Sequence, residues 1–497
     1  MFKKVLIANR GEIAVRVIRT LKEMGVQSAA VYSEADRSCL HVRMADEAVC
    51  IGPAMARESY LNIAAVISAA KLTGAEAIHP GYGFLAENAE FSEACAKNGL
   101  VFIGPSPKSI RLLGHKAEAR KMAVKAGIPI TPGTKDCVSK NCGPEAEKIG
   151  YPVMIKAAAG GGGKGIRIVR EKSQLAHELQ MAQSEAGAAF GNPAMYVEKY
   201  CEHPRHVEIQ VLCDKHGNRV TLGERDCTIQ RRHQKLLEES PSPIMTDKLR
   251  EAMSKAALKL CAAIDYENVG TVEFLVDEKR NFYFMEMNTR IQVEHPVTEF
   301  ITGLDLIEQQ IRIAQGEELK LKQEDVKLNG WAIECRINAE DVQAGFSPYL
   351  GTIEKMVQPT GDNIRVDSGI VEGDTISPNF DSMVAKLIVW GADRNEAIRE
   401  TKKALAKFWI KGLKTTIPFF KIVLENESFR CGTFNTGFIE NELESMHDTS
   451  EEEEALAAWF AALKYAEERE KEETNQVDFE QGKNINPWVL NKRLKSF

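Results

Sequence analysis

The sequence has little that would suit a membrane, an oxidising compartment or a nucleic-acid surface. It has no uninterrupted run of about 18 apolar residues, the length that a membrane-spanning helix needs. The apolar stretch near the N-terminus ends at Asn9 and is too short for the core of a signal peptide. The eleven cysteines are scattered without a C-x-x-C pair, and the formal net charge of −7 argues against general binding of nucleic acid. We therefore expect a cytoplasmic protein with reduced thiols and with neither membrane nor nucleic-acid contacts.

What is present is typical of a globular α/β enzyme. Hydrophobic residues make up 44% of the chain and charged residues 27%, as in ordinary globular proteins. A length of 497 residues is enough for roughly three domains, each with its own core. Over the first 110 residues, helical patterns alternate with β-rich runs, which lie at 4–8, 28–33, 75–80 and 100–105. This alternation predicts a parallel, Rossmann-like sheet. Its first turn, "ANRGE", has one glycine instead of three, so dinucleotide binding is not indicated, whereas the loop "HPGYGFLAEN" follows a strand, where open sheets bind ligands.

The stretch "IKAAAGGGGKGIRIV" (155–169) contains the pattern G-x-G-x-x-G at residues 160–165. A dinucleotide fingerprint needs a strand before it and a helix after it, but the β-patterned "IRIVR" follows here. Lys164 precedes Gly165 rather than Ser or Thr, which also excludes a P-loop. Two interpretations remain. One is a glycine flap between two strands whose N–H groups cover a triphosphate, and the other is a plain surface loop.

The segment "GTVEFLVDEKRNFYFMEMNTRIQVEHP" (270–296) joins two β-patterned runs by the turn-like "DEKRN" and predicts a hairpin. With a period of two, one face of the second run carries Glu286, Asn288, Arg290, Gln292 and Glu294. Glu273 on the first run, together with Glu286 and Asn288, offers two carboxylates and an amide oxygen. Such oxygens suit one or two Mg²⁺ ions that bridge nucleotide phosphates. The alternative is a solvated polar face of a sheet.

Basic residues gather in "ERDCTIQRRHQKLLEE" (224–239), and this stretch also ends in two glutamates. In an acidic protein, a local anion pocket fits this pattern better than a nucleic-acid patch. Upstream, Glu198 and Lys199 are predicted at the end of a strand, where the backbone can recognise an adenine edge. The next strand places His206, Glu208 and Gln210 on one face.

Two lone lysines and a late apolar stripe complete the pattern. Lys116 and Lys156 each stand in an apolar or glycine-bearing context and are either phosphate clamps or surface lysines. From about residue 330, "WAIECRINAE" and "MVAKLIVWG" predict strands, and "RNEAIRETKKALAKF" predicts a helix. Beyond residue 440 a charged helix is expected, with an apolar stripe formed by Leu456, Trp459, Phe460 and Leu463. This stripe packs either on the chain's own C-terminal domain or on a partner protein.

Eight stretches, considered together, indicate a protein family: "VLIANRGEIAVRV", "HPGYGFLAEN", "GGGGKG", "EKY…PRHVEIQV", "ERDCTIQRRHQK", "EMNTRIQVEHPVTE", "AIECRINAE" and "FDSM". In these stretches the chain resembles the biotin carboxylase family of ATP-grasp enzymes, from about residue 1 to 440. The resemblance implies an α/β and α+β architecture of four parts. These are a Rossmann-like N-terminal domain (1–112), an ATP-grasp domain (113–325) with a glycine-rich lid at about 132–200, an α+β C-terminal domain (326–445) and a charged helical tail (446–497). The glycine loop is then the lid that closes over ATP.

The resemblance also implies roles for matched residues. The ATP contacts are Lys116, Lys156, Gly162, Gly163, Glu198, Lys199, Tyr200, Cys201, His206, Gln230, His233, Glu273 and Glu286. The ligands of two Mg²⁺ or Mn²⁺ ions are Glu273, Glu286 and Asn288. The bicarbonate site is Lys235, Arg290, Gln292 and Val293; the general base is Glu294; and the biotin site is Tyr82, Gly83 and Arg336. The catalytic residues among these are Lys235, Arg290, Glu294 and Arg336. The chain departs from the family at Cys201, where leucine is common, and at His115, where Asp or Ser is usual.

The implied reaction is ATP- and bicarbonate-dependent carboxylation of biotin through carboxyphosphate. The chain has no A-M-K-M biotinylation motif, so we expect a separate carboxylase subunit. The resemblance also implies a homodimer. The subunit would act on biotin borne by a biotin carboxyl carrier protein or by a biotin-bearing carboxyltransferase subunit. The final acceptor, whether pyruvate, acetyl-CoA or another acyl-CoA, stays open. The alternatives are another ATP-grasp ligase and a catalytically inactive ATP-binding subunit.

Overall fold

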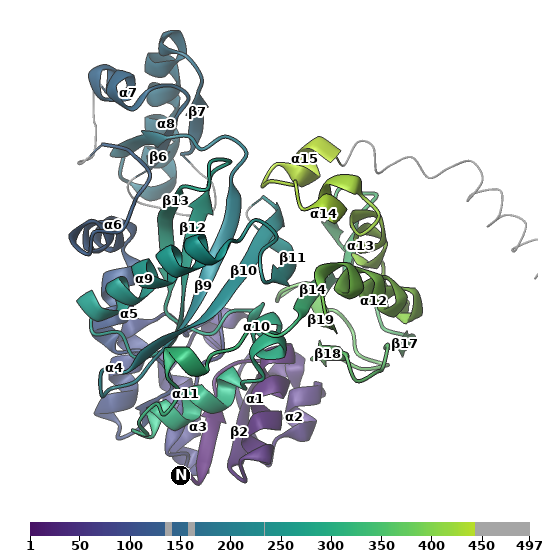
Figure 1. Ribbon diagram of the computed structural model, residues 1–497. Coiled ribbons are helices and arrows are strands. Elements are labelled where there is room, and N and C mark those ends of the chain that lie inside the picture. The colour runs from purple at the N-terminus through teal and green to yellow at the C-terminus, as the bar shows by residue number, and fades with distance from the viewer. Residues whose placement is uncertain (135–141, 158–164, 233, 443–497) are drawn as a thin grey trace, which may run out of the picture. The chain divides into compact units, whose positions relative to one another are not determined.

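A computed structural model describes residues 1–134, 142–157, 165–232 and 234–442 (Figure 1). Contacts between residues separate the chain into two units, Met1–Ile439 and Glu440–Phe497, and the site lies in the first. Among the described residues, no helix is both long enough and apolar enough to cross a bilayer. Ten cysteines lie in this part, all without disulfides and six of them buried.

The predicted Rossmann-like sheet is confirmed. Five parallel strands pair in the order β3-β2-β1-β4-β5. The strands are β1 (Lys4–Ile7), β2 (Gln27–Ser33), β3 (Glu47–Gly52), β4 (Ala77–His79) and β5 (Val101–Phe102), and the helices are α1 (Gly11–Glu23), α2 (Leu40–Met44), α3 (Ile63–Thr73) and α4 (Ala89–Lys97). The apolar run of β1 is buried because helices cover both faces of a parallel sheet. The loop after β4 therefore lies at the carboxyl edge of the sheet.

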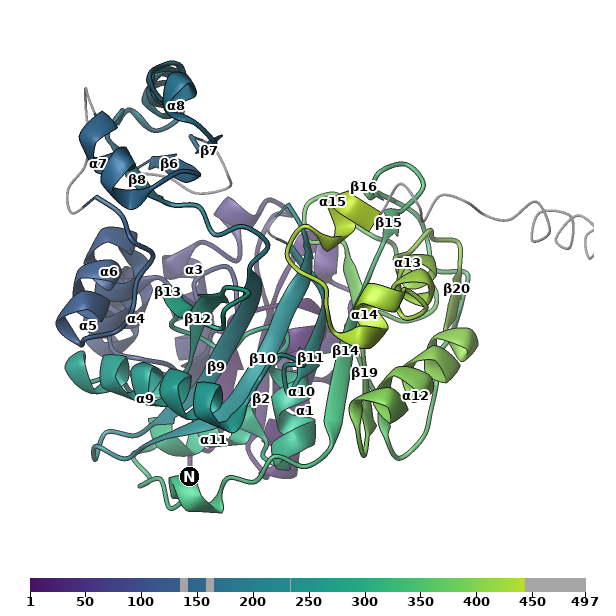
Figure 2. The same cartoon turned by 45° about the horizontal axis from the view of Figure 1, so that its top comes forward.

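An eight-stranded antiparallel sheet forms the centre, in the order β13-β12-β9-β10-β11-β14-β19-β18. Its strands are β9 (Arg205–Cys213), β10 (Arg219–Arg231), β11 (Gln234–Ser240), β12 (Asn268–Val276), β13 (Phe282–Asn288), β14 (Trp331–Asn338), β18 (Ile364–Ser368) and β19 (Met383–Gly391). Its helices are α9 (Asp247–Ala263), α10 (His295–Thr302), α11 (Leu306–Ala314) and α12 (Arg394–Lys407). Both views show α9 crossing β9 and β10 (Figures 1 and 2). Because β11 pairs with β14, the sheet runs unbroken across the expected boundary at 325/326.

The glycine loop lies between two strands of a small sheet, as predicted. β6 (Val153–Ala157) pairs with β7 (Arg167–Val169) on one side and with β8 (Met195–Lys199) on the other, both antiparallel. The helices of this layer are α7 (Gly143–Ile149) and α8 (Leu175–Phe190), and the two before it are α5 (Pro107–Gly114) and α6 (Lys116–Lys125). Val153, Ile155 and Val197 form its core with apolar residues of α8. Residues 158–164, which include the predicted lid glycines, lie outside the described part.

Short elements complete the C-terminal part and the connections. They are β15 (Glu340–Asp341), β16 (Ser347–Pro348), β17 (Lys355–Val357), β20 (Trp409–Lys411), α13 (Ile417–Val423), α14 (Glu427–Cys431), α15 (Phe438–Glu442) and the 3₁₀ turns η1 (Glu34–Asp36), η2 (Ala56–Glu58), η3 (Lys172–Gln174) and η4 (Gln323–Asp325). The predicted strands at β14 and β19 and the predicted helix at α12 are confirmed. The tail stripe at 456–463 lies outside the described residues.

Candidate active site

Glu294 is held between two cations that come from neighbouring strands. It precedes α10 and is 2% exposed. Lys235 on β11 donates from Nζ to Glu294 Oε1 at 2.7 Å, and Arg336 on β14 donates from Nη2 to Oε2 at 2.8 Å. Because β11 and β14 are adjacent and antiparallel, the two cations reach the carboxylate from the same sheet. The pairing of β11 and β14 thus builds the centre of the site.

Lys235 also contacts two further carboxylates. Its Nζ lies 2.6 Å from Glu208 Oε2 and 3.0 Å from Glu273 Oε1. Gln292 Nε2 donates to Glu273 Oε1 at 2.7 Å, while its Oε1 accepts from Arg225 Nη2 at 2.6 Å. Arg225 has no exposed surface and donates to Glu208 Oε1 at 2.5 Å. The site is therefore a closed network in which buried charges compensate one another.

The charges fix the protonation states. Burial alone would raise the pKa of Glu294, but Lys235, Arg336 and Arg225 outweigh it and hold that pKa well below its ordinary value. Burial would lower the pKa of Lys235, yet the surrounding acidic groups raise it well above its ordinary value. Glu294 is thus a carboxylate and Lys235 an ammonium at neutral pH. While it is paired in this way, Glu294 is ionised but only weakly basic.

The predicted hairpin is confirmed, and it brings the proposed metal ligands together. β12 and β13 pair antiparallel with Glu273 directly opposite Glu286, and Asn288 Nδ2 donates to Glu273 Oε1 at 2.6 Å. The other oxygen, Oε2, accepts from His206 Nε2 at 2.8 Å. Glu286 is partly exposed and its Oε2 lies 3.5 Å from Lys116 Nζ. Two carboxylates and an amide oxygen at one end of a hairpin fit the hard-oxygen preference of Mg²⁺.

A second group of possible ligands lies beside it. Atoms of His206, Glu208 and Glu273 lie within 4.8 Å of one another. Glu208, however, already accepts from both Arg225 and Lys235. A cation there would have to compete with two resident positive charges, so the partly exposed side towards Glu286 is the better place for a metal.

The expectation that the strand parity continues to Glu294 is wrong. β13 ends at Asn288, because Glu87 Oε1 accepts from both the backbone N–H and the hydroxyl of Thr289, at 2.9 and 3.1 Å, and the chain turns there. Arg290 Nε then donates to Glu87 Oε2 at 3.1 Å, and its Nη2 donates to Asn288 Oδ1 at 3.2 Å. Gln292 and Glu294 reach the site from a loop, not from a strand face.

The predicted lysines of the ATP site are paired with acids. Lys156 on β6 forms an ion pair with Glu198 Oε1 on β8, and Arg120 Nη1 donates to Glu198 Oε2 at 3.1 Å. Lys116 begins α6 and faces Glu286. Both ammonium groups are at least partly exposed, so each can exchange its carboxylate for a phosphate.

Among the other predicted ATP contacts, Lys199 and Tyr200 bond to backbone carbonyls. Lys199 Nζ donates to the carbonyls of Gly150 and Tyr151, both at 3.0 Å, so its ammonium is used within the small sheet. The backbone N–H of Tyr200 donates to Pro152 O at 3.1 Å. Gln230 Nε2 lies 3.4 Å from His206 Nδ1. Burial raises the pKa of the partly buried Cys201. Of the predicted contacts, Gly162, Gly163 and His233 lie outside the described residues.

The predicted biotin loop follows β4. Asn9 Nδ2 donates to the carbonyls of Pro80 and Tyr82, both at 2.7 Å. Gly81 has φ +62°, and a Cβ there would lie 2.9 Å from the Asn9 amide, so this turn requires glycine. The Tyr82 hydroxyl donates to Glu12, and Gly83 follows with φ +69°.

Three residues that the sequence analysis did not assign belong to the site. Arg225 and Glu87 lie in motifs quoted above, but only the fold shows that they contact Gln292 and Arg290. Glu238 Oε1 accepts from Arg336 Nε at 2.6 Å, and its Oε2 has no partner in the part of the chain that the structure describes. Burial, opposed by Arg336, raises the pKa of Glu238 to about 7. A period of two gives no signal for Glu238, since residues three apart in a strand point to opposite faces; the register shift between the pairs Ile229–Leu237 and Gln230–Lys235 shows that β11 departs from this period here.

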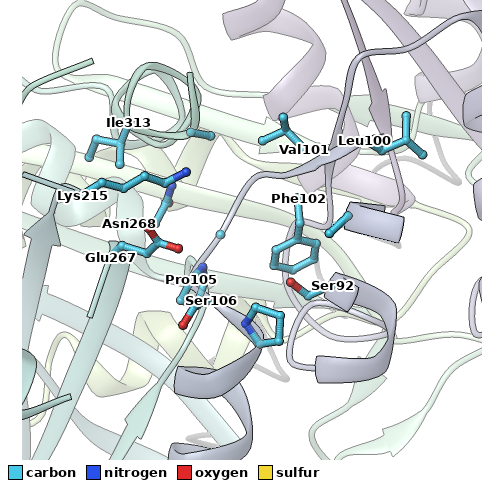
Figure 3. A pocket seen from close by; sticks show the side chains of 14 residues that line it. Ser92, Leu100, Val101, Phe102, Pro105, Ser106, Lys215, Glu267, Asn268 and Ile313 are labelled. Atoms are coloured by element: carbon cyan, nitrogen blue, oxygen red, sulfur yellow. The ribbon is translucent and has the colours of Figure 1, made fainter. Parts of the chain in front are cut away.

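A cavity of about 270 Å³ lies elsewhere, between β5 and the start of β12 (Figure 3). Phe102 and Ser92 face it from one side and Lys215, Glu267 and Asn268 from the other. None of the predicted site residues lines it. It therefore contributes nothing to the cluster around Glu294.

Three protein-family models match the chain. They are biotin carboxylase, N-terminal domain (residues 1–110), carbamoyl-phosphate synthase L chain, ATP binding domain (115–322), and biotin carboxylase C-terminal domain (334–441). Biotin carboxylase 1 of Bacillus subtilis is 56% identical over 443 residues, which cover 88% of this chain and 98% of that protein. The chain belongs to the biotin carboxylase family.

Two solved structures of the biotin carboxylase family widen the comparison. The crystal structure of the biotin carboxylase subunit of pyruvate carboxylase has a TM-score of 0.80 at 49% identity, and the match covers 89% of this chain and 99% of that one. The biotin carboxylase domain dimer of Hydrogenobacter thermophilus 2-oxoglutarate carboxylase was crystallised with MgADP, ADP and bicarbonate. It has a TM-score of 0.84 at 50% identity, over 89% of this chain and 98% of that one. The predicted family, ATP-grasp fold and ligase class are thereby confirmed.

Proposed function

We propose that the chain carboxylates biotin with ATP and bicarbonate at the cluster around Glu294. The observation that carries the proposal is one buried carboxylate held by Lys235 at 2.7 Å and Arg336 at 2.8 Å. A base between two cations is what the deprotonation and retention of a small anion require. The domain boundaries 112/113, 325/326 and 445/446 belong to this proposal, and the matches at 1–110, 115–322 and 334–441 support them.

Bicarbonate would bind where Glu294 now meets its cations. Lys235, Arg290, Gln292 and the backbone of Val293 hold the anion, which then shares the positive charge that keeps Glu294 weakly basic. As that charge is shared, the pKa of Glu294 rises towards the range of an effective general base. Glu294 then takes the O–H proton while the bicarbonate oxygen attacks the γ-phosphorus of ATP. The bond to the β-phosphate oxygen breaks, giving carboxyphosphate and ADP.

The triphosphate would lie along the hairpin and the lid. Lys116 and Lys156 exchange their carboxylate partners for phosphate oxygens. Glu273, Glu286 and Asn288 would hold Mg²⁺, which supplies neutralisation of phosphate charge. His206 fixes Glu273 from behind through its 2.8 Å contact. Closure of the lid at about 132–200 would exclude water, since carboxyphosphate hydrolyses readily.

Biotin would enter beside Arg336. Carboxyphosphate breaks into CO₂ and phosphate, and the phosphate takes the proton from the ureido nitrogen. The negative charge then develops on the ureido oxygen, which Arg336 stabilises, and the nitrogen attacks CO₂. Arg336 remains charged because Glu238 and Glu294, set against its burial, raise its pKa further above the ordinary value. Tyr82 and Gly83 line the other side of the pocket.

The partner and the setting also belong to this proposal. The chain works as a homodimer in the cytoplasm, on biotin carried by a carrier protein or by a biotin-bearing carboxyltransferase subunit. The dimer of the Hydrogenobacter domain and the biotin carboxylase subunit of pyruvate carboxylase support this arrangement. The partner subunit determines which molecule finally accepts the carboxyl group.

The decisive experiment measures ATP cleavage with and without bicarbonate, and again with free biotin. The proposal expects cleavage that depends on bicarbonate and increases with biotin, together with carboxybiotin formation. Cleavage without bicarbonate dependence contradicts it. Bicarbonate-dependent ATP cleavage without any carboxylation of biotin would favour another ATP-grasp ligase. ATP binding without cleavage would favour a catalytically inactive subunit.

A further inference from the structure

Lys386 is a buried lysine in the middle of an apolar strand. It lies in β19, within "MVAKLIVWG", and its side chain has no exposed surface. Its Nζ donates to the carbonyl of Val293 at 2.7 Å and lies 3.2 Å from Glu12 Oε1. A buried ammonium is costly unless it is paired. Burial would lower the pKa of Lys386, but Glu12, Glu334 and Asp367 raise it, so the group stays charged.

Glu12 connects this lysine to the biotin loop. It lies in the first turn of α1, is 5% exposed, and its Oε1 also accepts the hydroxyl of Tyr82. Its other oxygen has no hydrogen-bond partner among the described residues. One carboxylate oxygen thus joins Lys386 to Tyr82. Three segments far apart in the sequence meet at this point: the start of α1, the loop after β4 and β19.

The strand register places Lys386 beside the centre of the site. It is the direct partner of Arg336 on β14 and of Asp367 on β18, so all three side chains leave the same face of the sheet. The carbonyl that Lys386 holds belongs to the residue between Gln292 and Glu294. Any movement of this carbonyl therefore also moves its neighbours, the proposed base Glu294 and the side-chain amide of Gln292.

The contact between α1 and the β18–β19 segment is close. A Cβ at Gly369, one residue after β18, would lie 2.4 Å from the backbone nitrogen of Glu12. The start of α1 is therefore seated directly on this part of the C-terminal sheet, which leaves Glu12 little freedom. Because Glu12 is held firmly, it can fix the position of the Tyr82 loop relative to the loop that contains Val293.

We propose that Glu12 and Lys386 form a buried clamp that positions the bicarbonate loop, Thr289 to Glu294, against the Tyr82 loop of the biotin pocket. Both are positioning residues, since neither reaches the reacting atoms. The inference rests on the function proposed above. It predicts that the bicarbonate and biotin steps share a dependence on Lys386 that ATP binding lacks.

The first test compares Lys386→Met with Lys386→Arg. The methionine keeps the apolar stem and removes the donor and the charge. We expect the bicarbonate KM of ATP cleavage to rise about tenfold or more, as for loss of a charged hydrogen bond. The ATP KM should stay within about twofold, and arginine should restore part of the loss. Equal changes in both KM values, or no recovery with arginine, would overturn the clamp.

The matched control is Arg394→Met. Arg394 on α12 is a partly buried cation on a buried carboxylate, with Nε 2.7 Å from Glu239 Oε2, but it contacts neither Val293 nor Glu12 in the described part of the chain. We expect its melting temperature to fall while its bicarbonate KM stays within about twofold. A rise equal to that of Lys386→Met would mean that any lost buried ion pair has this effect, which contradicts the proposal.

A double-mutant cycle tests the link through Glu12. The biotin KM is measured for Tyr82→Phe, for Lys386→Met and for both together. Because both act through one carboxylate oxygen, their effects should be non-additive by more than about threefold; additive effects would refute the link. If Lys386→Met does not fold, Glu12→Gln replaces it in the same cycle. If the unchanged protein shows no bicarbonate-dependent ATP cleavage, the proposed function is wrong. If the unchanged protein is active but the effects of the two substitutions on the biotin KM are additive, only the clamp proposal is wrong.

Discussion

Glu294 and Arg336 meet at 2.8 Å although they are 42 residues apart in the sequence. Arg336 lies on the interior strand β14 and Glu294 directly before α10. Lys235 donates to the second carboxylate oxygen of Glu294 at 2.7 Å. One carboxylate therefore joins the cation proposed for bicarbonate to the cation proposed for biotin. The two halves of the reaction can be separated by removing one member at a time.

Glu294→Gln removes the base and keeps the shape. We expect ATP binding to change by less than about threefold, while bicarbonate-dependent turnover falls by about a hundredfold or more. Calorimetric ATP titration and a coupled ADP assay check the two parts. Turnover near that of the unchanged protein would show that another group takes the proton.

Arg336→Ala acts on the second half-reaction. ATP cleavage with bicarbonate alone should remain within about threefold, whereas carboxybiotin per ATP cleaved should fall by at least about tenfold, because the ureido oxygen loses its fixed cation. The assay follows labelled bicarbonate into biotin beside ADP release. An equal loss in both measurements would argue against this division between Arg336 and Glu294.

Glu238→Gln tests the pH dependence of stability. Burial raises the pKa of Glu238 from its ordinary value of 4.5 to about 7, so between these pH values the folded state binds more protons than the unfolded state. The unchanged protein therefore loses stability from this group as the pH rises through that window. Glutamine does not titrate, so the variant should gain relative stability between about pH 5 and pH 8, by up to ~3 kcal/mol. Urea unfolding at both pH values measures it, and a pH-independent difference would contradict the assignment.

Glu286→Gln tests the metal proposal. Glu286 is partly exposed and stands opposite Glu273 in the hairpin. Removing its charge should raise the Mg²⁺ concentration needed for half-maximal activity by about tenfold. Glu278→Gln is the control, because Glu278 is exposed on the turn of the same hairpin. A similar rise in the control would mean that only net charge matters.

Deletion of residues 448–497 tests the tail. The stripe of Leu456, Trp459, Phe460 and Leu463 predicts an amphipathic helix that either packs on the C-terminal domain or docks a partner protein. We expect the truncated chain to keep its activity on free biotin and to co-purify more weakly with the biotin-bearing partner. A truncated chain that is inactive on free biotin, or that binds its partner at full strength, would refute docking.

Local sequence patterns were sufficient to predict which segments form strands and which form helices. The period of two in 270–296 predicted the β12–β13 hairpin, and the β-patterned "IRIVR" after the glycines excluded a Rossmann turn; both expectations hold. Such patterns are readable because strand and helix periods are local. Residue types could also be matched to roles, as for Lys235 and Glu294, through resemblance to a family.

Tertiary structure alone decided which of these residues meet. Sequence parity placed Glu294 on a strand, but Glu87, about two hundred residues away, accepts from Thr289 and turns the chain into a loop. The sequence analysis did not single out Lys386, whose partners Glu12 and Val293 come from other parts of the chain. The reason is physical: a buried charge must be neutralised by whatever packing brings to it, and the pairing of β14 with β11 and β19 is a long-range property that no local period encodes.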